Sequence, residues 1–161
     1  MAFTKFQRII LISVGLVLLI TVLDIKGVNM FGLIGGLGGE SYKAIETQYL
    51  QFFWSFAFAI IFILAISWYI YTKDKSETVA LIAIPTILLQ GGWEDISYYI
   101  LGGYKFFGTT MPWLYENCFF MRWVAQIMGK TTVDSTSLIV SAGLSAIIAY
   151  YVYKYLEKSK W

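Results

Sequence analysis

The chain has 161 residues, of which 58% are hydrophobic and 14% are charged, with a formal net charge of +2 at pH 7 and a mean hydropathy of +0.67. Soluble domains are usually about 25% charged, and a chain of this size cannot hide so much apolar surface and stay monodisperse in water. The composition excludes an ordinary soluble domain and predicts an integral membrane protein with a single transmembrane domain over residues 1–161.

Two residue types that carry much enzyme chemistry are absent or rare. The chain contains no His and one Cys, Cys118. Without His it cannot build a bis-His haem site, a His-bound zinc or copper site, or a Ser-His-Asp triad from its own residues. One Cys allows neither an intrachain disulfide nor a CxxC redox pair. We therefore expect no bound metal and no cofactor.

The first predicted span covers residues 6–23 and contains IILISVGLVLLITVL after Lys5 and Arg8. A helix needs about 20 apolar residues to cross the hydrocarbon core. A basic start and an apolar middle also fit a cleaved signal peptide, but DIKGV (residues 24–28) follows with no A-x-A-like site. We expect the segment to be retained. The second predicted span, residues 49–71, leads through the short polar turn TKDKSE (residues 72–77) to the third.

The third predicted span, residues 79–101, carries the strongest functional indication in the sequence. Its second half reads GGWEDISYY (residues 91–99), which places the adjacent carboxyls Glu94 and Asp95 within an apolar segment. A straight helix from Val79 puts Glu94 about 22 Å along its axis, in the outer leaflet of a core about 30 Å thick. Ionisable residues at such depth are costly and are functional candidates.

Helical spacing predicts a polar stripe around Glu94 that faces the bundle, with Asp95 nearer the edge of the site. We expect Pro85 to kink the helix toward this site. The stripe on the third span consists of Gln90, Glu94, Ser97 and Tyr98, together with Gly91. The expected neighbours are Gln51 and Ser55 of the second span, Thr21 and Asp24 of the first, and Arg122.

The acidic pair has two interpretations. In the structural one, Glu94 or Asp95 forms an ion pair with Arg122 that docks an outer helix on the bundle. In the functional one, the pair exchanges protons or cations, or acts as a general acid–base. Adjacent carboxyls in a low dielectric do not readily ionise together, which suits either of these tasks.

Residues 112–128, PWLYENCFFMRWVAQIM, are apolar enough to resemble a fifth span. A fifth span would bury Glu116 and Arg122, each at a cost of a few kcal/mol. Trp113, Tyr115 and Trp123 instead suit the membrane–water interface. We predict an interfacial or re-entrant helix, so the fold class is an all-α bundle of four transmembrane helices plus this one.

The fourth predicted span, residues 135–153, carries a stripe of small residues at a strict four-residue step. In lipid, small residues let helix backbones approach closely. The stripe predicts a packing face within the bundle or against a partner chain, and it consists of Ser137, Ser141, Ser145 and Ala149.

With four spans and the N-terminus inside, seven Lys or Arg residues fall on the cytoplasmic side and five outside. This modest excess predicts a multi-pass cell-membrane protein with both termini in the cytoplasm. The cytoplasmic set is Lys5, Arg8, Lys73, Lys75, Lys154, Lys158 and Lys160.

Three function classes remain open from the sequence. The first in rank is a non-catalytic subunit or scaffold of a membrane complex, because the chain has few catalytic groups and no soluble domain. The second is a homo-oligomeric transporter or channel that uses Glu94 and Asp95 for proton or cation exchange. The third is a lipid- or isoprenoid-modifying enzyme with carboxyl acid–base catalysis. The expected partners are the lipid bilayer and either further copies of the chain or other membrane subunits. No basic groove with interleaved aromatics indicates nucleic-acid binding.

Overall fold

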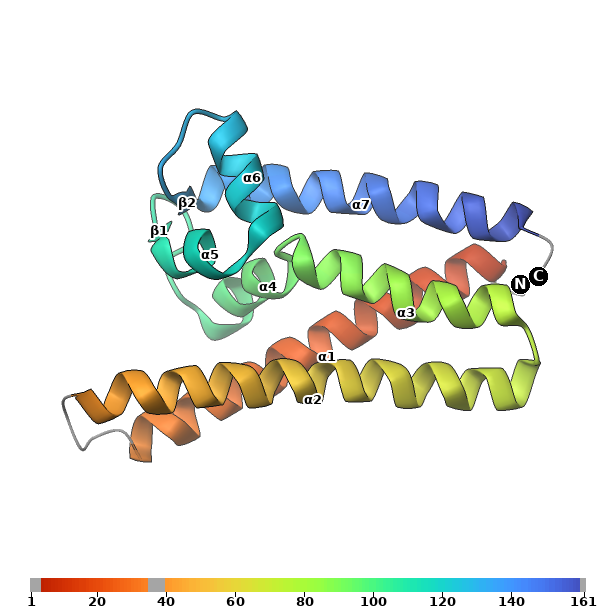
Figure 1. The fold of residues 1–161 in the computed structure, drawn as a ribbon, viewed down its shortest axis with the longest axis horizontal. Coiled ribbons are helices and arrows are strands. Elements are labelled where there is room, and N and C mark those ends of the chain that lie inside the picture. The colour runs from red at the N-terminus through yellow and green to blue at the C-terminus, as the bar shows by residue number, and fades with distance from the viewer. Residues whose placement is uncertain (1–3, 35–39, 160–161) are drawn as a thin grey trace.

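The computed structural model describes residues 4–34 and 40–159, and it describes side chains for residues 4–27 and 52–159. These residues are mostly helical (Figure 1) and form α1 (Lys5–Ile34), α2 (Glu40–Thr72), α3 (Lys75–Gln90), α4 (Trp93–Gly102), α5 (Pro112–Asn117), α6 (Phe119–Ile127) and α7 (Ser135–Lys158). Two short strands, β1 (Thr110–Met111) and β2 (Val133–Asp134), pair antiparallel. The predicted helical fold is confirmed, but this strand pair was not expected.

Three helices are long and apolar enough to cross a membrane, over the stretches Lys5–Gly27 in α1, Phe52–Thr72 in α2 and Ser135–Lys158 in α7. The helices α3 and α4 together meet the same criterion, but they are bent by 64° where they join. The described part of the chain therefore holds three candidate membrane-spanning helices, or four if the bent pair is one span.

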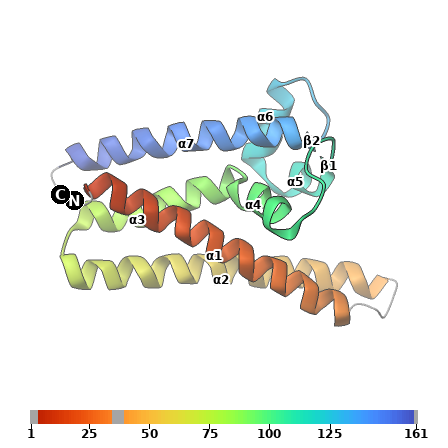
Figure 2. The same ribbon diagram turned by 180° about the vertical axis from the view of Figure 1, so that it is seen from behind.

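Helix α3 packs against α1, α2 and α7 and lies at the centre of the bundle. Seen from behind, α1 crosses α3 and continues toward α4 (Figure 2). The start of α1, the α2–α3 turn and the end of α7 lie at one end of the bundle (Figure 1). The opposite end carries α4 and residues 104–134. We call residues 104–134 the cap lobe.

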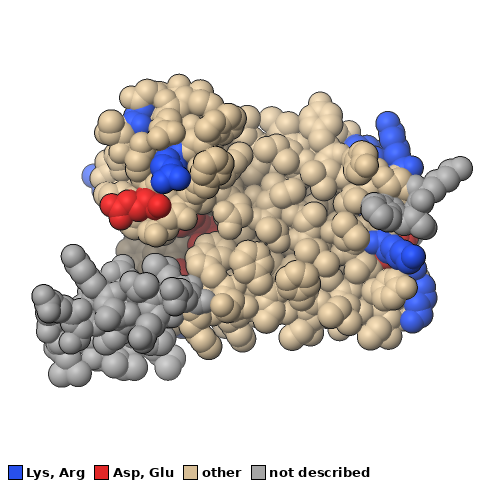
Figure 3. Space-filling model, in the orientation of Figure 1, with Lys and Arg blue, Asp and Glu red and all other residues tan. Residues whose placement is uncertain are grey.

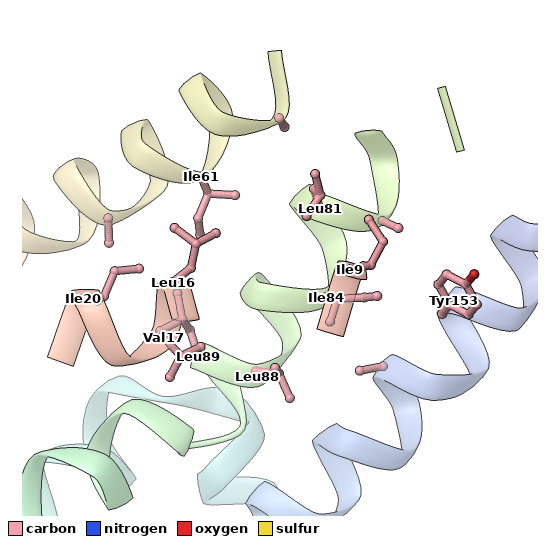
Figure 4. Packing of buried hydrophobic residues seen from close by; sticks show 14 of the residues in the cluster. Ile9, Leu16, Val17, Ile20, Ile61, Leu81, Ile84, Leu88, Leu89 and Tyr153 are labelled. Carbon is pink, nitrogen blue, oxygen red and sulfur yellow. The ribbon is translucent and has the colours of Figure 1, made fainter. Parts of the chain in front are cut away.

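The core consists of apolar side chains from the facing stripes of α1, α2, α3 and α7 (Figure 4). On α1 the buried residues Ile9, Leu16 and Ile20 recur at helical spacing, so they form one face. The opposite helix faces expose large apolar side chains, such as Ile63 and Tyr151. An exposed apolar surface of this extent is what a lipid-facing bundle presents.

The predicted third span is not one continuous helix, because α3 ends at Gln90 and α4 begins at Trp93. Gly92 has a φ of 93°, a left-handed conformation that glycine adopts without steric cost. A Cβ on Gly91 would lie 2.0 Å from the Ser145 hydroxyl oxygen, so only glycine allows α7 to approach here. Pro85 lies inside α3 without ending it, and the bend therefore comes from the glycine pair rather than from proline.

Residues 112–128 form two helices rather than one. Cys118 has an extended backbone and separates α5 from α6. The Asn117 side chain donates a 2.9 Å hydrogen bond to the Trp113 carbonyl, in competition with the helical backbone bond to the same acceptor. Beneath both helices a second apolar cluster joins the cap lobe to the start of α7, and it includes Met111, Leu114, Met121, Ala125, Val133 and Leu138.

Candidate functional site

Glu94 and Asp95 lie in the first turn of α4, directly after the bend. Their exposed fractions are 5% and 6%, so the structure buries both carboxyls to nearly the same degree. Burial of Glu94 agrees with the sequence analysis, whereas the expectation that Asp95 lies nearer the edge is wrong. The 64° bend is the reason, because it turns α4 and brings both side chains under neighbouring elements. The N-terminal turn of a helix also favours negative charge.

A third carboxyl joins the pair from α1. Asp24 lies within electrostatic reach of both Glu94 and Asp95. We call Asp24, Glu94 and Asp95 the acidic cluster. On the face shown in Figure 3, acidic atoms are visible at the bottom of a hollow beside the cap lobe.

One oxygen of the cluster has no partner. Oε1 of Glu94 is buried and makes no hydrogen bond with the part of the chain that the structure describes. Buried polar atoms are rarely left unpaired, and each exception calls for an explanation. The sequence interpretation that Arg122 neutralises the pair does not hold: Arg122 lies 5.9 Å from the centre of the Phe119 ring. Among the described side chains the ion pairs are Lys5–Asp74, Lys5–Glu77, Arg8–Glu77, Lys130–Asp134 and Lys154–Glu157.

A second buried glutamate, at the opposite end of the bundle, shows what a neutralised carboxyl looks like in this chain. Glu77 is as buried as Glu94, at 5% exposed. It accepts a 2.9 Å hydrogen bond from the Trp68 indole N–H and lies 3.4 Å from both Lys5 Nζ and Arg8 Nη2. Glu77 therefore ties α1 and α2 to α3, whereas Glu94 has acidic neighbours and an unpaired oxygen.

The other residues predicted for the site are only partly brought together. Tyr98 is half-buried and is an electrostatic neighbour of Glu94 and Asp24, and Ser97 is half-buried on the next turn after Glu94. Gln90 is exposed, and its backbone carbonyl lies 3.5 Å from the Cys118 thiol, which donates to it. Ser55 is exposed on α2. The side chain of Gln51 lies outside the described residues.

The small-residue stripe of α7 lies inside this one chain. Ser137, Ser141, Ser145 and Ala149 are all buried, and α7 packs against α3 along this face. Ser137 has a further role, because it forms a capping box with Asp134 at the start of α7: its N–H donates to the Asp134 carboxylate, and its hydroxyl accepts from the Asp134 N–H.

Of the aromatic residues beside the cluster, Tyr98 was predicted from the sequence, but its ring partner Tyr104 was not singled out. The rings of Tyr98 and Tyr104 are stacked with centroids 5.4 Å apart. The Gly102-Gly103 pair is the sequence feature that could have predicted this ring contact. Gly103 has a φ of 69° and turns the chain so that Tyr104 returns against α4. Trp93 donates its indole N–H to the Ala142 carbonyl at 3.0 Å and ties α4 to α7.

The chemistry that this arrangement allows is the binding of a positively charged group at the carboxylates of the acidic cluster. In the described part of the chain, no three His, Cys, Asp or Glu side chains have a geometry that could hold a metal ion. Burial raises the pKa of the Cys118 thiol, which lies outside the candidate spans, and this disfavours the reactive thiolate.

Comparison with known proteins adds no further assignment: no protein-family model, no curated protein and no solved structure matches this chain.

Proposed function

We propose that the chain is a small membrane transporter or channel, working as a homo-oligomer, that exchanges protons or other monovalent cations at Glu94, with Asp95 in support. The observation that carries this proposal is the unpaired, buried Oε1 of Glu94. An isolated carboxylate is costly in apolar surroundings unless it is neutralised. A transported cation or a proton supplies that neutralisation reversibly, which a fixed arginine does not.

The contrast between the two buried glutamates supports this function over a purely structural role. Glu77 has two cations and an indole N–H around it and serves as a tie between helices. Glu94 is equally buried and has carboxyls as neighbours. A structural carboxyl gains from permanent partners, whereas an exchange site has to release its partner in each cycle.

The bent α3–α4 pair provides a second argument. In membrane transporters, binding sites are typically formed where a helix is interrupted, because the helix ends and the freed backbone groups face the substrate. Glu94 and Asp95 lie at such an interruption. Three or four spans are few for a transporter that works as a single chain, so the proposal includes assembly with further copies.

Proton flux into vesicles tests the proposal. Purified protein in liposomes containing a trapped pH-sensitive dye, with a potassium gradient and valinomycin to set the potential, should acidify the lumen faster than empty liposomes do. Glu94→Gln keeps the side-chain shape and should reduce this flux at least tenfold, while its thermal unfolding stays close to wild type. Glu116→Gln is the matched control, because Glu116 is exposed on α5, and its flux should be unchanged. Equal fluxes for wild type and Glu94→Gln, or no flux above empty liposomes, would refute the proposal.

The second candidate is the class that the sequence ranked first, a non-catalytic subunit of a membrane complex. The observation in its favour is the apolar surface of the cap lobe, where Phe107, Phe119 and Ile127 are largely exposed. Purification in mild detergent followed by native mass measurement distinguishes the two. Other subunits in stoichiometric amounts favour the complex, and copies of this chain alone favour the transporter.

A further inference from the structure

We propose that the acidic cluster and the Tyr98–Tyr104 ring pair together form a binding site for an organic cation, a protonated or quaternary amine. This inference rests on the proposed function, since it names the class of substrate that Glu94 exchanges. It goes further by assigning a recognition role to aromatic residues that neither the sequence nor the proton-exchange argument requires.

The carboxyl side of the site is the unpaired Oε1 of Glu94. An ammonium group that reaches it gains a charge-assisted hydrogen bond or, if quaternary, a direct ionic contact. Such contacts are strong where water is excluded, and only 5% of Glu94 is exposed.

The aromatic side of the site begins one turn further along α4. Tyr98 is an electrostatic neighbour of Glu94. Its ring is nearly parallel to that of Tyr104, with 13° between the planes, and the Tyr99 ring lies edge-on to both at 6.1 and 6.4 Å. Asp95 is in turn an electrostatic neighbour of Tyr99. Carboxylates next to clustered tyrosine rings provide the combination that recognises ammonium groups, because the ring faces attract cations.

The exposure of the rings argues against a role in packing alone. Tyr104 is 46% exposed, and Tyr98 and Tyr99 are half-buried, so the ring cluster is open on one side. A ring pair that only filled the core would be covered. The open side of a half-buried cluster is where a cation approaches a ring face and then reaches Glu94.

A small apolar cavity lies on the adjoining face of α4. Its volume is about 100 Å³. Two of its lining residues are Trp93, which directly precedes Glu94, and Ser97, which directly precedes Tyr98. Because successive residues of a helix are about 100° apart, the cavity lies about 100° around α4 from the face that carries Glu94 and Tyr98. The remaining lining comes from α1 and α3, through Val14, Val17, Leu18 and Leu88.

Binding of benzyltrimethylammonium to the purified protein in detergent, measured by isothermal titration calorimetry, tests the inference. We expect saturable binding to the wild type. Glu94→Gln should weaken it more than tenfold, and Tyr104→Leu should weaken it roughly 3- to 30-fold, the range that loss of one cation–ring contact implies. Tyr104→Phe keeps the ring and should retain binding. Tyr151→Leu is the control, because Tyr151 is exposed on α7. Thermal unfolding and gel filtration of each variant confirm that it is folded.

The outcomes separate this inference from the proposed function. Saturable binding that depends on Glu94 and on the ring of Tyr104 supports it. Absence of saturable binding, in a preparation whose liposomes show Glu94-dependent proton flux, overturns the organic-cation site and leaves the proton-exchange function standing. Binding that survives both Glu94→Gln and Tyr104→Leu also overturns it, because the amine is then held elsewhere.

Discussion

Gly91 shows at the scale of one residue why this chain bends where it does. An added Cβ would lie 2.0 Å from Oγ and 2.2 Å from Cβ of Ser145, closer than any side chains can approach. The Ser145 hydroxyl is itself committed to the Ala142 carbonyl at 2.8 Å, so it has little freedom to move away. The contact between the bend and α7 therefore depends on the absence of a side chain at position 91.

Gly91→Ala should destabilise the protein by about 1–3 kcal/mol, the usual cost of forcing an extra group into a packed site. Gly143→Ala is the control, because no atom lies within 4 Å of a Cβ at that α7 position. In a helix, Ala is favoured over Gly by up to about 1 kcal/mol, so the control should be neutral or slightly stabilising. The melting temperatures of both variants in detergent measure this. A Gly91→Ala protein as stable as Gly143→Ala would mean that α7 does not pack against the bend.

Asp74 gives the chain a predictable response to acid. It lies in the turn between α2 and α3, outside the candidate spans, and its carboxylate accepts a 2.6 Å hydrogen bond from Lys5 Nζ and a 3.0 Å bond from the Glu77 N–H. The bond from Lys5, followed by the bond from the Glu77 backbone, lowers the pKa of Asp74 below its ordinary value of 3.8. A carboxyl whose pKa is lower in the folded state stabilises the fold above the unfolded pKa, and this contribution is lost as the pH falls through the folded pKa.

Wild-type protein should therefore lose stability between about pH 5 and about pH 3, and part of that loss should disappear in Asp74→Asn. Asparagine caps a helix as well as aspartate does, so this variant removes the charge and keeps the cap of α3. Asp74→Ala removes both and should cost about 1 kcal/mol more at every pH. Melting temperatures across this pH range provide the measurement. The same slope for wild type and Asp74→Asn would show that Lys5 and Asp74 do not interact in solution.

At the scale of elements, α7 uses its small residues inside the chain. Ser141 and Ser145 are buried where α7 packs against α3 and the bend, while Ile147 on the opposite side is 55% exposed. Ser141→Leu should therefore lower the melting temperature of the single chain, since overpacking costs about 1–3 kcal/mol. Ile147→Leu should leave it unchanged.

The oligomeric state of these two variants completes that experiment. Because the stripe packs within the chain, Ser141→Leu should reduce stability without changing the mass of the assembled particle. A variant that keeps its melting temperature but dissociates would place the stripe between chains instead.

The helices themselves could be predicted because span length and apolar composition are properties of local sequence. The bend could not be placed correctly, although Gly91 and Gly92 were visible, because only the packing of α7 shows that both positions exclude a Cβ: Ser145 approaches Gly91, and Leu138 approaches Gly92. For the same reason the depth of Glu94 was predicted for a straight helix that the structure does not contain. The Arg122 ion pair failed because α6 directs this side chain to the Phe119 ring, an orientation that depends on the break at Cys118.

At the scale of the whole molecule, the two ends of the bundle differ in their charges. The end where α1 begins and α7 ends carries Lys5, Arg8, Lys73, Lys75, Lys154 and Lys158, and Figure 3 shows basic side chains gathered there. Its carboxyls Asp74, Glu77 and Glu157 are paired with some of these cations. The opposite end holds the acidic cluster and the cap lobe. This asymmetry means that the two faces of a membrane would meet different surfaces of the protein.

From this asymmetry we predict that the basic end lies in the cytoplasm, since Lys and Arg are retained on that side during insertion. Single cysteines introduced on a Cys118→Ser background and treated with a membrane-impermeant maleimide in intact cells test it. Thr131→Cys, exposed in the cap lobe, should react, whereas Ser159→Cys, just after α7, should react only after the cells are opened. The pair is informative because the bundle places these two positions at opposite ends, so one of them should be labelled in either orientation. Labelling of Ser159→Cys alone in intact cells would reverse this orientation and place the cap lobe on the cytoplasmic side. Labelling of both would mean that α7, which lies between the two positions, does not cross the membrane.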